Sequence, residues 1–385
     1  MTTYINDSAS EYRIDEADGL LSPSLVIDRA IVRLNVAKTV EIARGVDRLR
    51  PHIKTHKAPA VVRLQSLEFG ISKFKCATIA EAEMIARVAI EIGRPLDVLL
   101  AYPLVGPNVA RFVRLIELYP STTFRAVVAD RKGAQALSAA TIDAALNRPI
   151  PTLVDLDVGM GRTGIAPGDD AFDLYTLVAR SRGLSADGLH AYDGHVHDFD
   201  IDDRRRSTDR GFAELDLLRT RLLNQGLTVP RVVIGGTPTF PIHAERELSG
   251  LECSPGTCVF HDAGYATRFP DLPFRVGAFV LTRVVSKPRR GRICLDVGYK
   301  AVAADPPNPR VELIGVPDAK IVSQSEEHLV VDTELSDTLE PGDALLAIPK
   351  HICPTCALYQ WAYVMEDHVI VDRWEIVARD RSIGV

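Results

Sequence analysis

Short apolar runs rich in valine, isoleucine and leucine recur every 20 to 40 residues between about residues 25 and 265. The segments between them space their apolar residues three or four apart, which is typical of amphipathic helices. In 81–93, for example, Met84, Ile85, Val88 and Ile92 form one stripe, and Gly93 stands where a helix is expected to end. The chain therefore predicts strands that alternate with helices. The expected strands lie at 51–55, 73–78, 97–103, 124–130, 151–159, 188–195, 231–237 and 251–257.

Eight strand and helix units predict a (β/α)8 TIM-like barrel, and an open doubly wound sheet is the alternative. After about residue 270 the apolar runs follow one another without helical spacing between them. Pro341 and Gly342 make a turn before one such run, as in antiparallel strands. We expect a barrel of residues 25–268, and an antiparallel β domain formed by 269–385 together with 1–24.

The composition of the chain argues against nucleic-acid binding, secretion and a membrane span. The chain has 385 residues, 45 Lys and Arg against 51 Asp and Glu, and a net charge of −6, so no basic field is available to bind nucleic acid. The polar start and the lack of any run of eighteen apolar residues predict neither a signal peptide nor a membrane span. We therefore expect a cytoplasmic protein with six reduced cysteines.

The first candidate for chemistry is Lys54, at the end of the expected strand 51–55. Working residues of a barrel lie at the carboxyl ends of its strands. Neighbouring cations such as His56 and Lys57 would favour the uncharged amine, which is the nucleophile that forms Schiff bases. The alternative is a solvated basic strand end.

Two glycine-containing turns follow the last two expected strands. Gly235, Gly236 and Thr237 form one turn, and Gly256 and Thr257 belong to the other. Backbone amides that approach an anion closely, next to a hydroxyl, can bind phosphate, and barrel phosphate sites follow the last strands. Together with a lysine at the barrel mouth, these turns predict the phosphorylated aldehyde cofactor pyridoxal 5′-phosphate.

Two more strand ends carry polar candidates. Arg162, in a glycine-flanked loop, could hold a cofactor ring oxygen or a carboxylate, or could be a surface arginine. Tyr192 could stack on a pyridine ring. His195 and His197, two apart in an extended chain, would share a face for proton transfer or metal binding, with buried structural histidines as the alternative.

The last candidate is a metal site in 349–356. His351 and Cys353, again two apart, offer nitrogen and sulfur to one ion, with zinc the best match by ligand softness. Two protein ligands leave coordination positions open, as catalytic metals require. Cys356 forms C-x-x-C with Cys353, so a structural zinc or a redox pair is the alternative.

The chain resembles the D-threonine aldolase and D-serine dehydratase family of pyridoxal-phosphate enzymes, which has the alanine racemase type of fold. The resemblance extends over almost the whole chain and depends on many motifs in the family's order. These motifs are RPHIKTHK, KFKCATIAEAE, LLAYP, DLDVGMGRTGI, YDGHVHD, GGTPTFP, ECSPGTCVFHDAGY, LDVGYKAVAADPP, SEEHL and PKHICPTCALY.

This resemblance implies a role for each candidate. Lys54 would be the Schiff-base lysine, and a divalent ion (zinc, manganese or magnesium) would bind His351 and Cys353. The phosphate would lie among Gly236, Thr237, Gly256 and Thr257, with Arg162, Tyr192 and Tyr265 lining the cofactor.

At two positions the chain differs from patterns within the family, and both differences bear on which reaction is expected. Alanine racemases carry an arginine at the position of Ser254, so racemisation is not expected. Several aldolases of the family present His-x-Asp to the metal, whereas eukaryotic D-serine dehydratases present His-x-Cys, as His351 and Cys353 do here.

The longer motifs resemble the aldolase branch more closely. They imply cleavage of a D-3-hydroxy amino acid to glycine and an aldehyde, in a homodimer. In that reaction we expect His195 or His197, or a metal hydroxide, to be the base that removes the hydroxyl proton. The alternatives are elimination to a keto acid and ammonia from D-serine or D-threo-3-hydroxyaspartate and, from another class, a non-enzymatic pyridoxal-phosphate carrier. A carrier would need neither the β domain nor the His-x-Cys pair.

Overall fold

The computed structural model describes residues 12–15 and 17–385. Their contacts divide the chain into two units. The barrel unit contains Thr39–Lys54, Val61–Gly256 and Asp380–Val385, and the β unit contains the described residues up to Lys38, Thr55–Ala60 and Thr257–Arg379. Each unit is discontinuous in the chain, and the helices α1 (Arg29–Ala43) and α2 (Pro59–Phe69) run from the β unit into the barrel unit.

The barrel unit contains seven parallel strands in chain order, with an eighth extended segment that closes the ring. Residues 49–53 bridge the first and last strands: Leu49 pairs with Cys253, and His52 pairs with Lys75. The backbone amides of Arg50 and Ile53 donate to Cys253 and Lys75, respectively. The ring is therefore a (β/α)8 barrel, as expected, and not an open sheet. The strands are β2 (Lys73–Cys76), β3 (Asp97–Leu100), β4 (Thr123–Val128), β5 (Ile150–Leu156), β6 (Leu184–Ala191), β7 (Val232–Ile234) and β8 (Leu251–Cys253).

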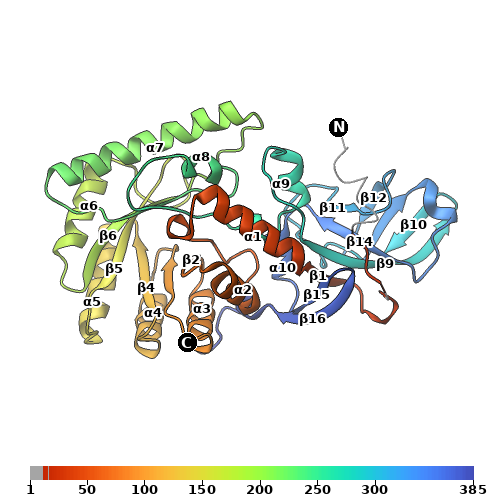
Figure 1. Ribbon diagram of the computed structural model, residues 1–385, viewed down its shortest axis with the longest axis horizontal. Helices are drawn as coiled ribbons and strands as arrows, with labels where there is room; N and C mark the ends of the chain where they lie inside the picture. The colour runs from red at the N-terminus through yellow and green to blue at the C-terminus, as the bar shows by residue number, and fades with distance from the viewer. Residues whose placement is uncertain (1–11, 16) are drawn as a thin grey trace. The chain divides into compact units, whose positions relative to one another are not determined.

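Helices follow the strands of the barrel unit, and α4, α5 and α6 run along β4, β5 and β6 (Figure 1). The helix expected in 81–93 is α3, which begins two residues earlier because Thr78 caps it: the Thr78 side chain accepts from the Glu81 amide, and the Glu81 carboxylate accepts from the Ala77 amide. The helices of this unit after α2 are α3 (Ile79–Glu91), α4 (Pro107–Leu118), α5 (Arg131–Asp143), α6 (Asp169–Arg180), α7 (Ile201–Asn224) and α8 (Phe240–Ala244).

The barrel interior contains layers of different polarity. Arg50 is fully buried and forms ion pairs with Asp97 and Glu252 near the amino ends of the strands. An apolar cluster comprises Leu99, Val127, Leu153 and Val233. Lys75 follows Lys73 by two residues on β2, so both side chains lie on the same face of that strand, and Lys75 is nearer its carboxyl end. Asp155 and Leu153 are related in the same way on β5. The layer that Lys75 and Asp155 begin forms the floor of the candidate site.

The β unit is a mostly antiparallel sheet, as expected, with one parallel pair between β1 and β15. The strand β1 (Ser24–Asp28) lies between β9 and β15, although its apolar run resembles those of the barrel strands. The domain boundaries drawn from the sequence stay a proposal. The other strands are β9 (Ala278–Arg289), β10 (Arg292–Leu295), β11 (Val311–Leu313), β12 (Lys320–Gln324), β13 (Leu329–Asp332), β14 (Ala344–Pro349), β15 (Trp361–Glu366) and β16 (Val369–Glu375), and two short helices are α9 (Ala263–Arg268) and α10 (Ile352–Cys356).

Within the described part of the chain, no helix is both long enough and apolar enough to cross a membrane.

Candidate active site

Three cationic side chains gather around the ring of Tyr192 at the carboxyl ends of the barrel strands. The Nζ atoms of Lys54 and Lys75 lie 5.6 and 5.8 Å from the ring centroid, and Cζ of Arg162 lies 4.9 Å from it. Segment 49–54, β2 and the loop after β5 each contribute one cation, so the barrel ring brings together residues that are far apart in the sequence. Lys54, Arg162 and Tyr192 were expected to line one site.

Lys75 is the functional candidate that the sequence analysis missed. Its side chain is 2% exposed, and burial together with the charge of Lys54 lowers its pKa to about 7, although Asp155 and Asp193 act in the opposite direction. The available signal in the sequence was a lysine between two apolar residues, Phe74 and Cys76, within an expected strand. It went unused because the strand was expected to contribute apolar residues to the barrel.

His56 and Lys57, the cations expected beside Lys54, do not play that part: one is uncharged near neutral pH and the other donates a hydrogen bond elsewhere. Burial lowers the pKa of His56 to about 3, so this histidine is uncharged near neutral pH. The Nζ of Lys57 donates to the carbonyl of Ala378 in the β unit. The expectation was wrong in this detail, because residues next to each other in the chain leave the strand end in different directions, whereas Lys75 comes from the neighbouring strand.

Two buried carboxylates accompany the cations, and each already holds a histidine. His190 Nδ1 lies 2.7 Å from Asp155 Oδ1, and His243 Nε2 lies 2.7 Å from Asp193 Oδ2. Burial lowers the pKa of His190 despite the hydrogen bond with Asp155, and its Nε2 has no hydrogen-bond partner among the described residues. A buried unpaired ring nitrogen beneath the cations marks a place where a polar group of a ligand could bind.

The two expected phosphate turns lie against each other. The amide of Gly256 donates to the Thr237 hydroxyl at 3.2 Å. Gly235 has a φ of 88°, a left-handed conformation that favours glycine. A Cβ atom on Gly236 would lie 3.0 Å from Cε2 of Tyr192, so the turn approaches the tyrosine ring as closely as a glycine allows.

The Tyr192 ring also packs against Gly194, two residues later in the chain. A Cβ atom on Gly194 would lie 2.2 and 2.4 Å from two ring atoms of Tyr192 and 2.5 Å from its phenolic oxygen. Glycines at 194 and 236 therefore leave the ring space that side chains would fill, and they fix it beside the phosphate turns. This arrangement suits a flat ring that stacks on a ligand.

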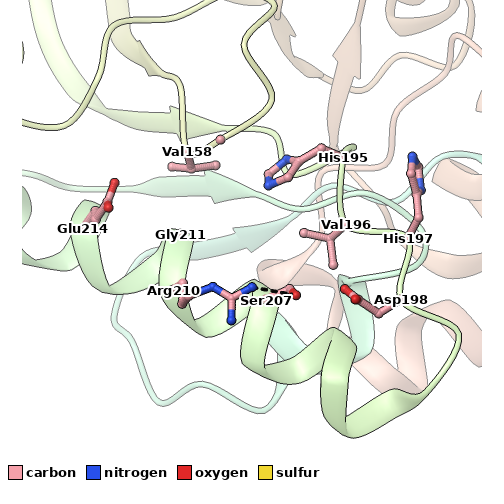
Figure 2. A pocket seen from close by; sticks show the side chains of 10 residues that line it. Val158, His195, Val196, His197, Asp198, Ser207, Arg210, Gly211 and Glu214 are labelled. Atoms are coloured by element: carbon pink, nitrogen blue, oxygen red, sulfur yellow. Dashed lines mark hydrogen bonds between the residues drawn. The ribbon is translucent and has the colours of Figure 1, made fainter.

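His195 and His197 line a different part of the barrel mouth. They border an open cavity of about 670 Å³, whose other lining residues are Val158, Gly159, Val196, Asp198, Ser207, Arg210, Gly211 and Glu214 (Figure 2). The two rings point in different directions, because the segment turns, with the amide of Val196 donating to Asp193. The expectation that they share one face of an extended chain was wrong. Neither Lys54 nor Tyr192 lines this cavity.

In the β unit, His351 and Cys353 lie at the start of α10. They interact through a hydrogen bond between their side chains, and His351 Nδ1 also lies 2.6 Å from Asp305 Oδ2. Burial would lower the pKa of His351, but Cys353 and Asp305 raise it to about 9. The segment is helical from Ile352 onward, so the two side chains meet at a helix start and not along an extended chain.

Two threonine hydroxyls surround the Cys353 sulfur. Thr55 Oγ1 lies 3.2 Å from Sγ, and Thr257 Oγ1 lies 3.5 Å from it. Thr55 directly follows Lys54 in the chain, and Thr257 was expected at the phosphate. In each of these contacts either the hydroxyl or the thiol can be the donor, and the hydroxyls could donate to a thiolate, the form of cysteine that binds metals. The structure thus gives Thr257 a contact that the sequence did not predict.

Cys356 has a different environment from Cys353. Its side chain is fully buried, and burial raises the pKa of its thiol. Among the described residues, no group of three or more histidine, cysteine, aspartate and glutamate side chains is placed to hold a metal ion. His351 and Cys353 therefore form at most a two-ligand site, and Asp305 supports the histidine from the other side of its ring.

The remaining residues expected at the cofactor lie as follows. Tyr265 is on α9 of the β unit, where its amide donates to Asp262 and its ring lies 5.5 Å from that of Phe269. Ser254, at the position of the racemase arginine, donates its hydroxyl to the carbonyl of Arg50. Ser254 is thus engaged with the backbone of the closing segment.

Comparisons with known proteins agree with this architecture. Residues 27–263 match the alanine racemase N-terminal domain, and residues 277–365 match a putative serine dehydratase domain. D-threonine aldolase of Arthrobacter sp is 31% identical over 371 residues, covering 94% of this chain and 93% of the relative. The 3-hydroxy-D-aspartate aldolase of Paracoccus denitrificans (strain Pd 1222) is 28% identical, covering 96% and 94%.

A solved structure is similar over nearly its full length. The crystal structure of D-threonine aldolase from Filomicrobium marinum superimposes with a TM-score of 0.85 at 28% identity, covering 94% of this chain and 96% of that one. The described elements and the sequence similarity therefore agree on one assignment. The chain belongs to the family that joins an alanine racemase N-terminal domain to a serine dehydratase-like C-terminal domain, and D-threonine aldolase and 3-hydroxy-D-aspartate aldolase are its relatives.

Proposed function

We propose that this protein is a lyase dependent on pyridoxal 5′-phosphate and a divalent metal, and that it cleaves D-3-hydroxy amino acids such as D-threonine to glycine and an aldehyde. The observation that carries the proposal is the group of Lys54, Lys75 and Arg162 around Tyr192, next to two hydrogen-bonded glycine turns. The 31% identity with an aldolase over 94% of the chain supports the choice of reaction.

The residues present fit a phosphorylated pyridine aldehyde. Lys54, Arg162 and the buried amine of Lys75 gather around Tyr192 and offer nitrogen donors to an anionic ligand. Gly194 and Gly236 let the Tyr192 ring pack closely against their backbones, which holds the ring next to the glycine turns. The turn amides and the Thr237 hydroxyl would bind the phosphate, and Arg162 would bind the ring oxygen.

Pyridoxal 5′-phosphate, when bound, supplies a conjugated ring that accepts the electrons of a bond broken at the substrate Cα. The protein's own groups supply the rest. Lys54 provides the amine that exchanges with the substrate amine. Tyr192 would hold the ring of the cofactor in place beside the glycine turns.

His351 and Cys353 would hold the metal. A divalent ion, when bound, lowers the pKa of the substrate's β-hydroxyl. Asp305 fixes the orientation of the His351 ring through Nδ1 and leaves Nε2 for the ion, while Thr55 and Thr257 support the thiolate. We propose His195 and His197 as the candidate bases that remove the hydroxyl proton; the choice between them awaits separate His195→Asn and His197→Asn variants.

One assay tests the reaction. Purified protein is incubated with pyridoxal 5′-phosphate, Mn²⁺ or Zn²⁺ and, separately, D-threonine, D-serine and D-threo-3-hydroxyaspartate. Aldehyde and keto acid are then measured in parallel. We expect aldehyde and glycine from D-threonine, with none from L-threonine. Keto acid and ammonia without aldehyde would contradict the aldolase assignment.

That second outcome defines the alternative function, a dehydratase of D-serine or D-threo-3-hydroxyaspartate. Cys353 favours it, because His-x-Cys is the pattern of eukaryotic D-serine dehydratases, and residues 277–365 match a putative serine dehydratase domain. We further propose a homodimer, which light scattering of the active enzyme tests directly. An active monomer would contradict that assembly.

A further inference from the structure

Lys75 is a buried amine with an unusual environment. Its side chain is 2% exposed, yet among the described residues its amine takes part in no hydrogen bond or ion pair. A lysine that is almost wholly buried without a paired carboxylate is costly in a purely structural position. Its Nζ lies 5.8 Å from the centroid of the Tyr192 ring.

The groups that face Lys75 come from several strands. Lys54 lies on the closing segment, Asp155 and His190 on β5 and β6, and Arg162 and Asp193 in the loops that follow these two strands. Both carboxylates already have histidine partners, Asp155 with His190 and Asp193 with His243. The surroundings of Lys75 therefore favour its neutral form until a further negative charge arrives.

We propose that Lys75 is a ligand-binding residue of this site, whose amine takes up a proton as it binds the anionic part of a phosphorylated pyridine ligand on Tyr192. This inference rests on the proposed function and adds to it a residue with its own role beside Lys54. Lys54 provides the covalent amine, whereas Lys75 adjusts the charge of the site to its ligand.

A pKa of about 7 in the ligand-free protein agrees with this role. Near pH 8 most Lys75 amines would be neutral, and a dianionic ligand nearby would raise the pKa and draw in a proton. Binding of the ligand should therefore be linked to proton uptake and should weaken as the pH rises above 7.

The experiment uses pyridoxine 5′-phosphate, which has an alcohol in place of the aldehyde and cannot condense with Lys54. Titration calorimetry at pH 8 in HEPES and in Tris gives the affinity and the number of protons taken up by the cofactor-free protein. The variants are Lys75→Met and Lys75→Arg. Lys73→Met, on the same strand but paired with Glu252, is the matched control.

We expect Lys75→Met to weaken binding by about 10- to 100-fold and to remove the proton uptake, since a charge-assisted hydrogen bond is lost. Without ligand, the same variant should unfold at a higher temperature than the wild type, because a buried unpaired amine is replaced by an apolar side chain. Lys75→Arg should bind without proton uptake, and Lys73→Met should bind as the wild type does.

The outcomes that overturn the inference are distinct from those that overturn the function. If Lys75→Met binds with wild-type affinity and proton uptake, or if it is less stable than the wild type while binding is unchanged, Lys75 is structural and the inference fails. If the wild type itself binds no pyridoxine 5′-phosphate, the proposed function fails and the inference fails with it.

Discussion

Replacing Arg50 by methionine tests the polar layer near the amino ends of the barrel strands. Arg50 is fully buried and donates from Nε to Glu252 at 2.6 Å and from Nη1 to Asp97 at 2.7 Å. Removing one partner of a buried ion pair costs about 3 to 5 kcal/mol, because the charge left behind is buried and uncompensated. Asp97 keeps Arg125 and Glu252 keeps Lys73, so we expect a loss near the lower end, about 3 kcal/mol.

A loss of that size should lower the melting temperature by about 6 to 12 °C for a unit of this size. Urea unfolding and calorimetry on the cofactor-free protein measure it. The control is Arg114→Met, whose side chain is largely exposed and pairs with Glu117 on the same helix, α4, where about 0.5 kcal/mol is expected. A loss below about 1 kcal/mol in Arg50→Met would refute the reasoning about uncompensated buried charge.

The same variant has a pH signature. Burial would raise the pKa of Asp97, but Arg50 and Arg125 lower it to about 2. A carboxylate whose folded pKa lies below its unfolded value stabilises the protein above the unfolded pKa, near 4, and loses that contribution as the pH falls toward 2. The stability difference between wild type and Arg50→Met should therefore be constant above about pH 5 and shrink below pH 4.

Three further predictions concern the site itself. Lys54→Ala should abolish the visible absorption of enzyme-bound pyridoxal 5′-phosphate, and an unchanged spectrum would remove Lys54 from its proposed role. Gly236→Ala places a Cβ atom 3.0 Å from Cε2 of Tyr192, so the cofactor should bind about tenfold more weakly with stability changed by less than about 1 kcal/mol, as fluorescence titration would show. Cys353→Ala should lose the metal and turnover while melting stays nearly constant, whereas Cys356→Ala should keep the metal; loss of metal from Cys356→Ala, with melting lowered in parallel, would indicate a structural zinc instead.

Much of the fold follows from local pattern. Buried parallel strands are continuous apolar runs, so seven of the eight expected strands overlap β2 to β8, and the remaining one overlaps the closing segment 49–53. The agreement is poorest for β6 (Leu184–Ala191), which shares only residues 188–191 with the expected strand 188–195. The run in β1 has the same local character, yet it pairs with β9 and β15. Strand partners depend on distant residues, and no property of Ser24–Asp28 alone distinguishes a barrel strand from a strand of the other sheet.

The sequence could predict those residues of the candidate site that directly follow a barrel strand. Lys54, Arg162 and Tyr192 are such residues, because the carboxyl ends of all the strands of a barrel lie at the same end of it. Side-chain direction in an irregular segment does not follow from spacing, and for that reason the shared face expected for His195 and His197 was wrong: a turn separates their rings.

Lys75 and Thr55 show what spacing cannot supply. The sequence of β2, KFKC, is the same whether Lys75 reaches solvent or the barrel interior. The environment of Lys75 arises only when Lys54, Asp155 and Arg162 arrive from other segments of the chain. Thr55 gains its role in the same way, through Cys353, which lies almost 300 positions later in the chain. The residues that adjust the charge of a site are therefore harder to predict than those that carry its chemistry, because their function is a property of the assembled neighbours and not of the residue type.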